Sequence, residues 1–190
     1  TIAFQLTERG APSYRVVHGT ETIIEDSQLG FELQGQAPLA EGFEVVTSEQ
    51  NSFDETWEMP WGEQRTVRNH YNELVVELRE SAPPQRRLKL YFRAYDDGVA
   101  LRYEVLAQAG VDSLVITDER TDFQFTGDHT AWWIPGDWDI YEHLYNTTKV
   151  SEIDALSKRG HPNLAQSTIP LNAVNTPVTL RTESGTHLSI

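Results

Sequence analysis

The sequence contains no cysteine and only one methionine among its 190 residues. The absence of cysteine excludes disulfide bonds, thiolate zinc sites and cysteine nucleophiles. Positive charge is also scarce, because 15 lysines and arginines stand against 29 aspartates and glutamates, which gives a formal net charge of −14 at pH 7. Such a charge repels phosphate backbones and anionic lipid surfaces. We therefore expect no nucleic-acid partner and no membrane partner.

Long apolar runs and common catalytic motifs are missing as well. No apolar run approaches the roughly 18 residues of a membrane span. The sequence has no GxSxG, GxxxxGK(S/T) or GxGxxG motif, and no pair of its six histidines has the spacing of a helical HExxH zinc site. Asp137, Asp139 and Glu142 could approach a hard cation, but their spacing is not that of an EF-hand. The sequence therefore predicts no metal site in this chain.

The residues that are present favour β-strands nearly everywhere. Apolar and polar residues alternate along 74–79, 88–95 and 101–105, which is the period of a sheet with one wetter face. Asp96-Asp97-Gly98 separates the last two runs and predicts a hairpin with a type I′ turn. Short strands at this spacing predict an all-β sandwich or barrel with antiparallel sheets. One short helix is expected over 150–158, and further strands are expected over 14–17, 22–25, 31–34, 43–48, 66–68, 113–117, 122–126, 131–134, 168–171, 178–182 and 186–190.

The densest polar and aromatic stretch runs over residues 54–63 and continues over 68–73. Tryptophan rings stack on the C–H face of a pyranose, while carboxylate, amide and guanidinium groups bind hydroxyls. The alternative is a long solvated loop whose tryptophans close one edge of the core. The candidates for contact with a sugar or with a neighbouring domain in this stretch are Glu55, Trp57, Trp61, Glu63, Arg68, Asn69 and Asn72.

A second aromatic stretch contains Trp132 and Trp133, followed by Trp138 and Tyr141. Neighbouring residues of a strand point to opposite faces. One of the first two tryptophans is therefore expected in the core, and the other is expected on a face that could meet a sugar, a partner domain or a second sheet. Both are kept as candidates.

Several short segments follow one another in a recognisable order. They are SQLGF (27–31), ETW (55–57), WGE (61–63), RNHYNEL (68–74), FRAYDDGVALRY (92–103), DE (118–119), WWIP (132–135) and YE (141–142). They span roughly residues 14 to 190, and each is weak by itself, whereas the ordered set is fairly specific. Together they resemble the N-terminal domain of glycoside hydrolase family 97, whose members are α-glucosidases and α-galactosidases.

The resemblance implies a β-super-sandwich related to the domain of galactose mutarotases, placed before a catalytic (β/α)8 barrel. It implies that the catalytic carboxylates and the ligands of an active-site calcium ion lie outside this chain. We therefore expect one domain over residues 1–190, cut from a longer exported enzyme of the bacterial periplasm. No catalytic residue, metal or cofactor is expected in the fragment, although calcium is expected in the full-length enzyme.

Three functions remain open at this point. The first is a non-catalytic domain that packs on the barrel and helps to shape a pocket for α-linked glucosides or galactosides. The second is an independent carbohydrate-binding module, which calorimetry with maltooligosaccharides or galactosides would separate from the first. The third is a mutarotase-like enzyme, for which His70 with Glu73, or His143 with Glu142, could supply an acid and a base.

Overall fold

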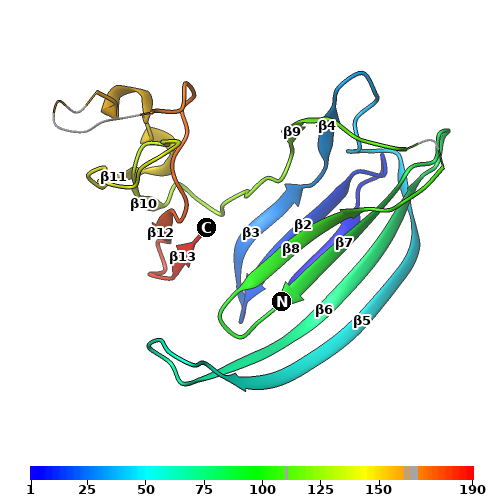
Figure 1. The fold of residues 1–190 in the computed structure, drawn as a ribbon, viewed down its shortest axis with the longest axis horizontal. Coiled ribbons are helices and arrows are strands. Elements are labelled where there is room, and N and C mark those ends of the chain that lie inside the picture. The colour runs from blue at the N-terminus through cyan, green and yellow to red at the C-terminus, as the bar shows by residue number, and fades with distance from the viewer. Residues whose placement is uncertain (110, 161, 163–166) are drawn as a thin grey trace. The chain divides into compact units, whose positions relative to one another are not determined.

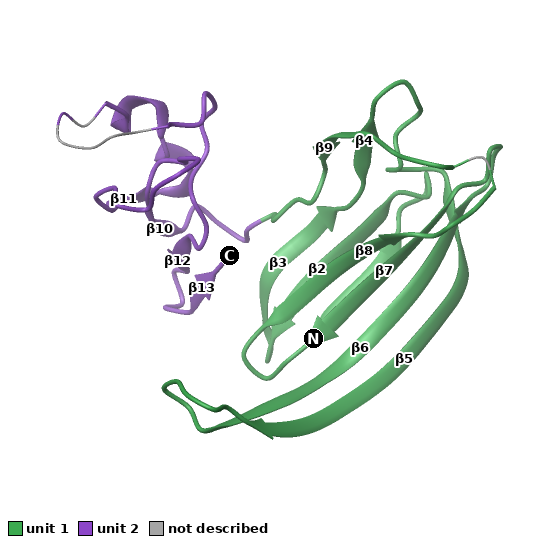
Figure 2. Ribbon diagram, viewed as in Figure 1, with its two compact units in different colours: residues 1–124 green, residues 125–190 purple. Residues whose placement is uncertain are grey.

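The computed structural model describes residues 1–109, 111–160, 162 and 167–190, and its regular elements are nearly all β-strands (Figure 1). The chain divides into two compact units, unit 1 (Thr1–Gln124) and unit 2 (Phe125–Ile190), which Figure 2 colours separately. All strand pairs between named strands are antiparallel, so the predicted all-β fold class is confirmed. The described helices are two short 3-10 turns, and neither could cross a membrane.

Unit 1 contains a four-stranded sheet of order β5-β6-β7-β8, a three-stranded sheet of order β1-β2-β3, and the pair β4-β9. Its strands are β1 (Ile2–Leu6), β2 (Pro12–His18), β3 (Glu21–Gln28), β4 (Phe31–Leu33), β5 (Phe43–Glu58), β6 (Thr66–Glu80), β7 (Arg87–Ala94), β8 (Val99–Val105) and β9 (Ile116–Glu119).

Alternating apolar residues build one buried face of the four-stranded sheet. Val76 pairs with Leu90 and Leu78 pairs with Leu88 across β6 and β7, and all four side chains are buried. Residues directly opposite each other in an antiparallel pair share a face, so these positions form one apolar layer. The strands predicted from this alternation are confirmed, because β6 and β8 include two of them and β7 includes the third except for Tyr95.

The apolar layer packs against the smaller sheets. The ring of Phe4 in β1 lies 5.6 Å from that of Phe92 in β7, measured between centroids. The ring of Phe31 in β4 lies 4.5 Å from that of Tyr103 in β8. The Tyr103 hydroxyl accepts the backbone N–H of Gly30 at 3.2 Å, and burial raises the pKa of this phenol to about 12. Unit 1 is thus a sandwich whose core lies between its sheets.

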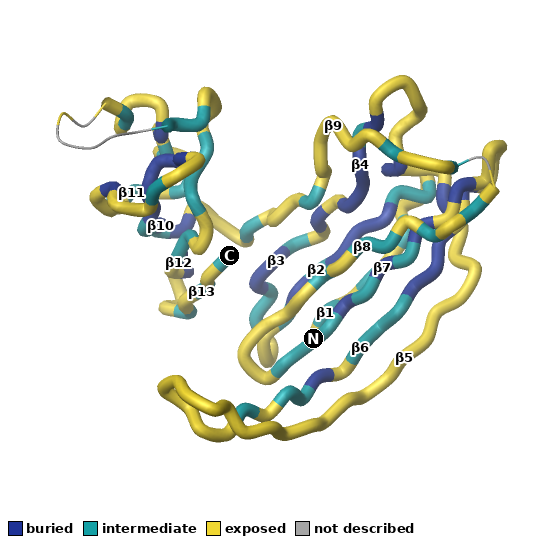
Figure 3. The backbone as a smooth tube through the Cα atoms, in the orientation of Figure 1, coloured by how far each residue is buried: buried dark blue, intermediate teal, exposed yellow. Residues whose placement is uncertain are grey.

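Strand β5 differs from the other strands of its sheet because it is exposed along almost its whole length (Figure 3). It has 16 residues, and only Phe43 is buried. It pairs with β6 from Phe43 opposite Glu80 to Glu58 opposite Thr66, with one shift of register between Val45 and Thr47. The predicted strands 43–48 and 66–68 were therefore too short. An edge strand rich in charged side chains is protected against pairing with other chains.

Unit 2 has a small sheet of order β11-β10-β12-β13. Its elements are β10 (Thr130–Trp133), β11 (Asn146–Lys149), η1 (Val150–Glu152), η2 (Leu156–Lys158), β12 (Thr179–Arg181) and β13 (His187–Ser189). Four residues form its buried core, namely Ala131, Trp133, Ala155 and Leu180. Larger partly buried side chains pack around them, including Phe125, Val150, Ile153, Val174, Val178 and Leu188.

Several local predictions differ from the structure. The hairpin between β7 and β8 forms, but Gly98 does not adopt a positive φ, so its turn is not the predicted type I′. The helix expected over 150–158 is two separate 3-10 turns. Residues 122–126 form no strand, and in 168–171 only Thr168 makes an isolated bridge, with Asp137. Strands β1 and β11 were not predicted.

Candidate functional site

The hairpin of β5 and β6 carries the first set of candidate residues, and most of them lie in its strands rather than in a loop. β5 ends at Glu58 and β6 begins at Thr66, so only Trp61 and Glu63 belong to the connecting turn. The alternative of one long solvated loop over residues 54–63 and 68–73 is therefore wrong, because most of these residues lie in two paired strands.

The register of the hairpin divides the strand candidates between the two faces of the sheet. Glu55 pairs with Asn69, and Trp57 pairs with Val67. Because side chains alternate along a strand, Glu55, Trp57 and Asn69 share one face, whereas Arg68 and Asn72 point to the other. These five residues therefore cannot all contact one ligand from the same side.

We call the first of these surfaces the aromatic face; it comprises Phe53, Glu55 and Trp57 of β5 with Asn69 and Tyr71 of β6. The Asn69 amide donates to Glu55 Oε1 at 3.2 Å. Phe53 stacks on Tyr71 with ring centroids 5.3 Å apart and an interplanar angle of 27°. Phe53 and Trp57 are 41% and 42% exposed. Flat rings beside an amide and a carboxylate are the groups that sugars contact.

Arg93 of β7 extends the aromatic face. Its guanidinium lies 4.3 Å from the centroid of the Tyr71 ring, and its Nε donates to Glu73 Oε2 at 2.7 Å. Sequence analysis missed Phe53, Tyr71 and Arg93. The missing signal was the length of β5, since Phe53 lies two residues before Glu55 and so falls on the same face once the strand continues to Glu58.

The opposite face of the hairpin carries an ion pair. Arg68 donates through Nε to Asp54 Oδ1 at 2.8 Å and through Nη2 to Asp54 Oδ2 at 2.6 Å. These hydrogen bonds lower the pKa of the Asp54 carboxyl group. Asp54 therefore stays ionised near neutral pH and accepts hydrogen bonds, which is not the behaviour of a general acid.

The turn of the hairpin displays the most exposed tryptophan in the described part of the chain. Trp61 is 83% exposed. The Trp57 indole donates to Met59 Sδ at 3.2 Å, which fixes the start of the turn. Residues 58–65 line a shallow hollow that is open to solvent. Trp61 and Glu63 are thus displayed together at the end of the hairpin.

The two adjacent tryptophans of unit 2 point to opposite faces of β10, as predicted. Trp133 is 1% exposed, and its indole donates to Thr148 Oγ1 at 3.0 Å. Trp132 lies on the other face, with its ring centroid 6.4 Å from that of His187. The burial of Trp133 assigns it to packing and leaves Trp132 as the surface candidate of the pair.

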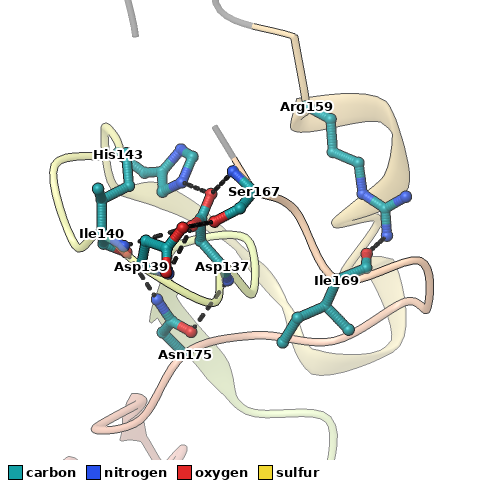
Figure 4. A network of polar contacts seen from close by, with 8 residues as sticks. All are labelled: Asp137, Asp139, Ile140, His143, Arg159, Ser167, Ile169 and Asn175. Atoms are coloured by element: carbon teal, nitrogen blue, oxygen red, sulfur yellow. Dashed lines mark hydrogen bonds and ion pairs between the residues drawn. The ribbon is translucent and has the colours of Figure 1, made fainter. Parts of the chain in front are cut away.

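Two of the three acidic residues considered as cation ligands, Asp137 and Asp139, belong to a hydrogen-bonded network (Figure 4). The buried Asp137 carboxylate accepts the backbone N–H of Asp139 at 3.0 Å and lies 3.2 Å from His143 Nε2. The Ser167 hydroxyl lies 3.0 Å from Asp137 Oδ1 and 2.6 Å from Asp139 Oδ2. These donors, that of Asp139 foremost, lower the pKa of Asp137 to about 2.

The remaining acid–base and metal candidates are not brought together. His70 and Glu73 are three residues apart in β6 and so point to opposite faces, while Glu73 binds Arg93. His143 binds Asp137, and the side chain of Glu142 is exposed. Within the described ranges, no group of three histidine, cysteine, aspartate or glutamate residues is arranged to hold a metal ion.

A family model described as Glycosyl-hydrolase 97 N-terminal matches residues 1–190. The chain belongs to this family. The matched region runs over both units, and the single domain expected over residues 1–190 stays a prediction. The family match confirms the resemblance inferred from the ordered segments.

Solved structures of the glycoside hydrolase family 97 support the same assignment. The chain is 34% identical to an enzyme variant from Pseudoalteromonas sp. strain K8 in complex with panose, with a TM-score of 0.83. A complex of the enzyme from that strain with acarbose gives a TM-score of 0.81 at the same identity. The predicted β-super-sandwich is thereby confirmed. A beta-arabinopyranosidase shares the fold over 74% of this chain, with a TM-score of 0.64 and 23% identity.

Curated relatives of this glycoside hydrolase 97 N-terminal chain are retaining enzymes. A retaining alpha-galactosidase of Bacteroides thetaiotaomicron is 25% identical over 75% of this chain, and a probable one of Streptomyces bingchenggensis is 32% identical over 65% of it. The chain spans only 22% and 18% of those two proteins, and 26% of the Pseudoalteromonas enzyme. It therefore matches the N-terminal part of much longer proteins.

Proposed function

We propose that this chain is the non-catalytic N-terminal domain of a glycoside hydrolase, that it packs on the catalytic (β/α)8 barrel, and that its β5–β6 hairpin helps to shape the sugar pocket. The observation that carries the proposal is the match of 99% of this chain to 26% of a family 97 enzyme. The other three quarters leave room for a barrel of about 250 residues. The active sites of such barrels lie in loops at one face, which a flanking sandwich can border.

The carboxylates of the chain support a non-catalytic role. Every described aspartate or glutamate with a resolved shift has a lowered pKa, namely Asp54, Glu80, Asp128 and Asp137. In the usual glycosidase mechanism one carboxylic acid has a raised pKa, so that it can protonate the leaving group. These four carboxylates are ionised acceptors that are engaged with donors, and such groups suit structure or the binding of hydroxyls.

The end of the hairpin is the part of this chain that we assign to the pocket. Trp61 and Glu63 are solvent-exposed in the turn, and Trp57 follows Glu55 on the aromatic face. An indole and carboxylates in one exposed segment can border a sugar site without taking part in bond cleavage. This arrangement also suits the alternative of an independent carbohydrate-binding module, which would bind sugar without the barrel.

Kinetics of the full-length enzyme test the role of the hairpin. We expect Trp61→Ala and Glu63→Gln each to lower kcat/KM, by about tenfold for the tryptophan if one stacking contact of about 1.4 kcal/mol is lost. Glu49→Gln, in the exposed middle of β5, serves as the matched control and should leave kcat/KM unchanged. Unchanged kinetics in both hairpin variants, with the fold intact by circular dichroism, would remove the hairpin from the pocket.

The substrate class, the calcium ion and the location of the parent enzyme belong to the same proposal. α-Linked glucosides are supported by the panose and acarbose complexes of the solved relative, and α-linked galactosides by the names of the curated relatives. We place calcium in the full-length enzyme and the enzyme in the bacterial periplasm. Asp137 does not fit as a calcium ligand, because N–H and O–H donors already occupy its carboxylate.

A further inference from the structure

The largest group of exposed apolar side chains in the described part of unit 2 lies in a segment that the hairpin proposal does not use. Trp138, Tyr141, Leu144 and Tyr145 are 70%, 68%, 77% and 65% exposed. All four lie within eight consecutive residues, and we call residues 138–145 the docking loop. A concentration of bare aromatic and aliphatic side chains of this kind marks an interaction surface.

Hydrogen bonds and close packing hold the backbone that enters the docking loop, although the four side chains are exposed to solvent. Trp138 donates its backbone N–H to the Ser167 carbonyl at 3.0 Å, and Gly136 donates to the Ala173 carbonyl at 2.8 Å. A Cβ atom at Gly136 would lie 2.9 Å from Ile169 Cδ1, so the segment is tightly packed there. The docking loop therefore begins directly after a stretch of chain whose backbone is held in place.

Hydrogen bonds from polar side chains of unit 2 hold the backbone of the docking loop. Asp137 accepts the backbone N–H groups of Asp139 and Ile140 at 3.0 and 3.3 Å, and His143 binds its other oxygen (Figure 4). Asn175 accepts the N–H of Asp137 at 3.2 Å and donates to the Ile140 carbonyl at 3.3 Å. A loop with a fixed backbone loses less conformational entropy when its side chains bind a partner.

The composition of the loop favours a protein surface over a sugar as the occupant. Tryptophan and tyrosine are enriched at the centres of protein interfaces. Leu144 is the most exposed of the four side chains, and an aliphatic chain gives no flat face on which a pyranose can stack. The exposed acids Asp139 and Glu142 lie in the same segment and would suit lysine or arginine at the rim of a partner.

We propose that the docking loop is the surface through which this domain binds the catalytic part of its own enzyme. The inference rests on the proposed function, which supplies the occupant: the relatives contain three to four times as much chain beyond the matched region. The partner surface is mainly apolar, with basic residues at its rim. Asp137 and His143 are positioning residues, which hold the loop and do not touch the partner.

Hydroxyl-radical footprinting of the 190-residue chain and of the full-length enzyme tests this assignment. We expect labelling of Trp138, Tyr141 and Tyr145 to fall at least about fivefold in the full-length enzyme. The labelling of Trp57 and Trp61, measured in the same experiment, shows whether the hairpin is protected. Unchanged labelling of the three docking-loop residues overturns the inference. If the hairpin is protected in that case, the proposed function stands; if neither region is protected, both fail.

Panose added to the 190-residue chain separates a sugar site from a protein interface. The inference predicts no change in the labelling of Trp138, Tyr141 or Tyr145 with the sugar present. Protection of these residues by panose alone, to the level seen in the full-length enzyme, would make the docking loop a carbohydrate site and would overturn the inference.

A double variant, Trp138→Ala with Tyr141→Ala, provides a second readout. We expect it to lower the melting temperature of the full-length enzyme by several degrees and to leave that of the 190-residue chain unchanged, because both side chains are solvent-exposed in the chain alone. Val115→Ala, an exposed apolar residue of unit 1, is the control and should shift neither. Equal shifts in both proteins would show a merely structural role and contradict the proposal.

Discussion

In unit 1, apolar side chains that alternate along the strands build the core, whereas in unit 2 polar side chains bind the backbone of irregular segments around a small apolar core. In unit 1, Leu88, Leu90 and Phe92 are fully buried at every second position of β7. In unit 2, Asn172 accepts the N–H of Ala155 at 2.7 Å and donates to the Ile153 carbonyl at 2.9 Å. Arg159 donates to the carbonyls of Ile169 and Leu171.

The two exposed aromatic regions therefore have different kinds of scaffold. The hairpin places Trp57 on, and Trp61 beyond the end of, a long ladder of backbone hydrogen bonds, which needs no particular side chain. The docking loop has no regular ladder, so Asp137 and Asn175 satisfy its backbone instead. Backbone groups away from water must find partners, and a short irregular segment finds them in side chains. Single polar substitutions should therefore harm unit 2 more than the hairpin.

The largest effect on this comparison is expected from the single large aromatic residue in the core of unit 2. Trp133→Ala removes a fully buried indole, and we expect a loss of about 3–5 kcal/mol in the free energy of unfolding of unit 2. Trp132→Ala, one residue away on the other face, is the matched control and should cost much less. Differential scanning calorimetry of the 190-residue chain measures both, and an equal loss in the two variants would contradict the assignment of Trp133, rather than Trp132, to the core.

A smaller effect is expected from the charge of Asp137, which binds the backbone of the docking loop. Asp137→Asn keeps the shape of the side chain but removes the carboxylate that its donors stabilise, so the melting temperature of unit 2 should fall by several degrees at pH 6. Because the folded-state pKa is lowered to about 2, the stabilisation is present above about pH 4 and is lost as the pH falls toward 2.

The pH dependence of the unfolding midpoint distinguishes this charge effect from a loss of packing. The unfolding midpoint of unit 2 in the natural chain should fall between pH 4 and pH 2. In Asp137→Asn the midpoint should fall less over the same pH range. Asp139→Asn leaves the Asp137 carboxylate in place and should therefore keep the loss of stability between pH 4 and pH 2. A fall of the same size in Asp137→Asn would show that this carboxylate does not stabilise the loop.

Much of unit 1 could be predicted from its sequence, because burial on one face imposes a period of two. The exception is β5, whose residues 49–54 are mostly polar. An edge strand exposed on both faces has no apolar period to reveal it, so its length was underestimated. Phe53, Tyr71 and Arg93 were missed for the same reason, since their shared face depends on that length and on pairing across three strands.

Less of unit 2 could be predicted, because its local structure depends on distant residues. Asp137 binds Ser167 and Asn175, which lie 30 and 38 residues further along the chain. No local pattern of the sequence predicts such distant pairs. The segment 168–171 has the alternation of a strand, although it makes only one isolated bridge. The opposite faces of Trp132 and Trp133 followed from strand geometry alone, and the structure decided which of the two is buried.

The most direct test of a non-catalytic docking domain is the hydrolysis of 4-nitrophenyl α-glucoside and α-galactoside by the purified 190-residue chain beside the full-length enzyme. We expect the chain alone to release nitrophenol at the rate of buffer, while the full-length enzyme hydrolyses at least one of the two substrates. Hydrolysis by the chain alone that follows the protein through purification, and that disappears when one of its own carboxylates is substituted, would contradict a non-catalytic role.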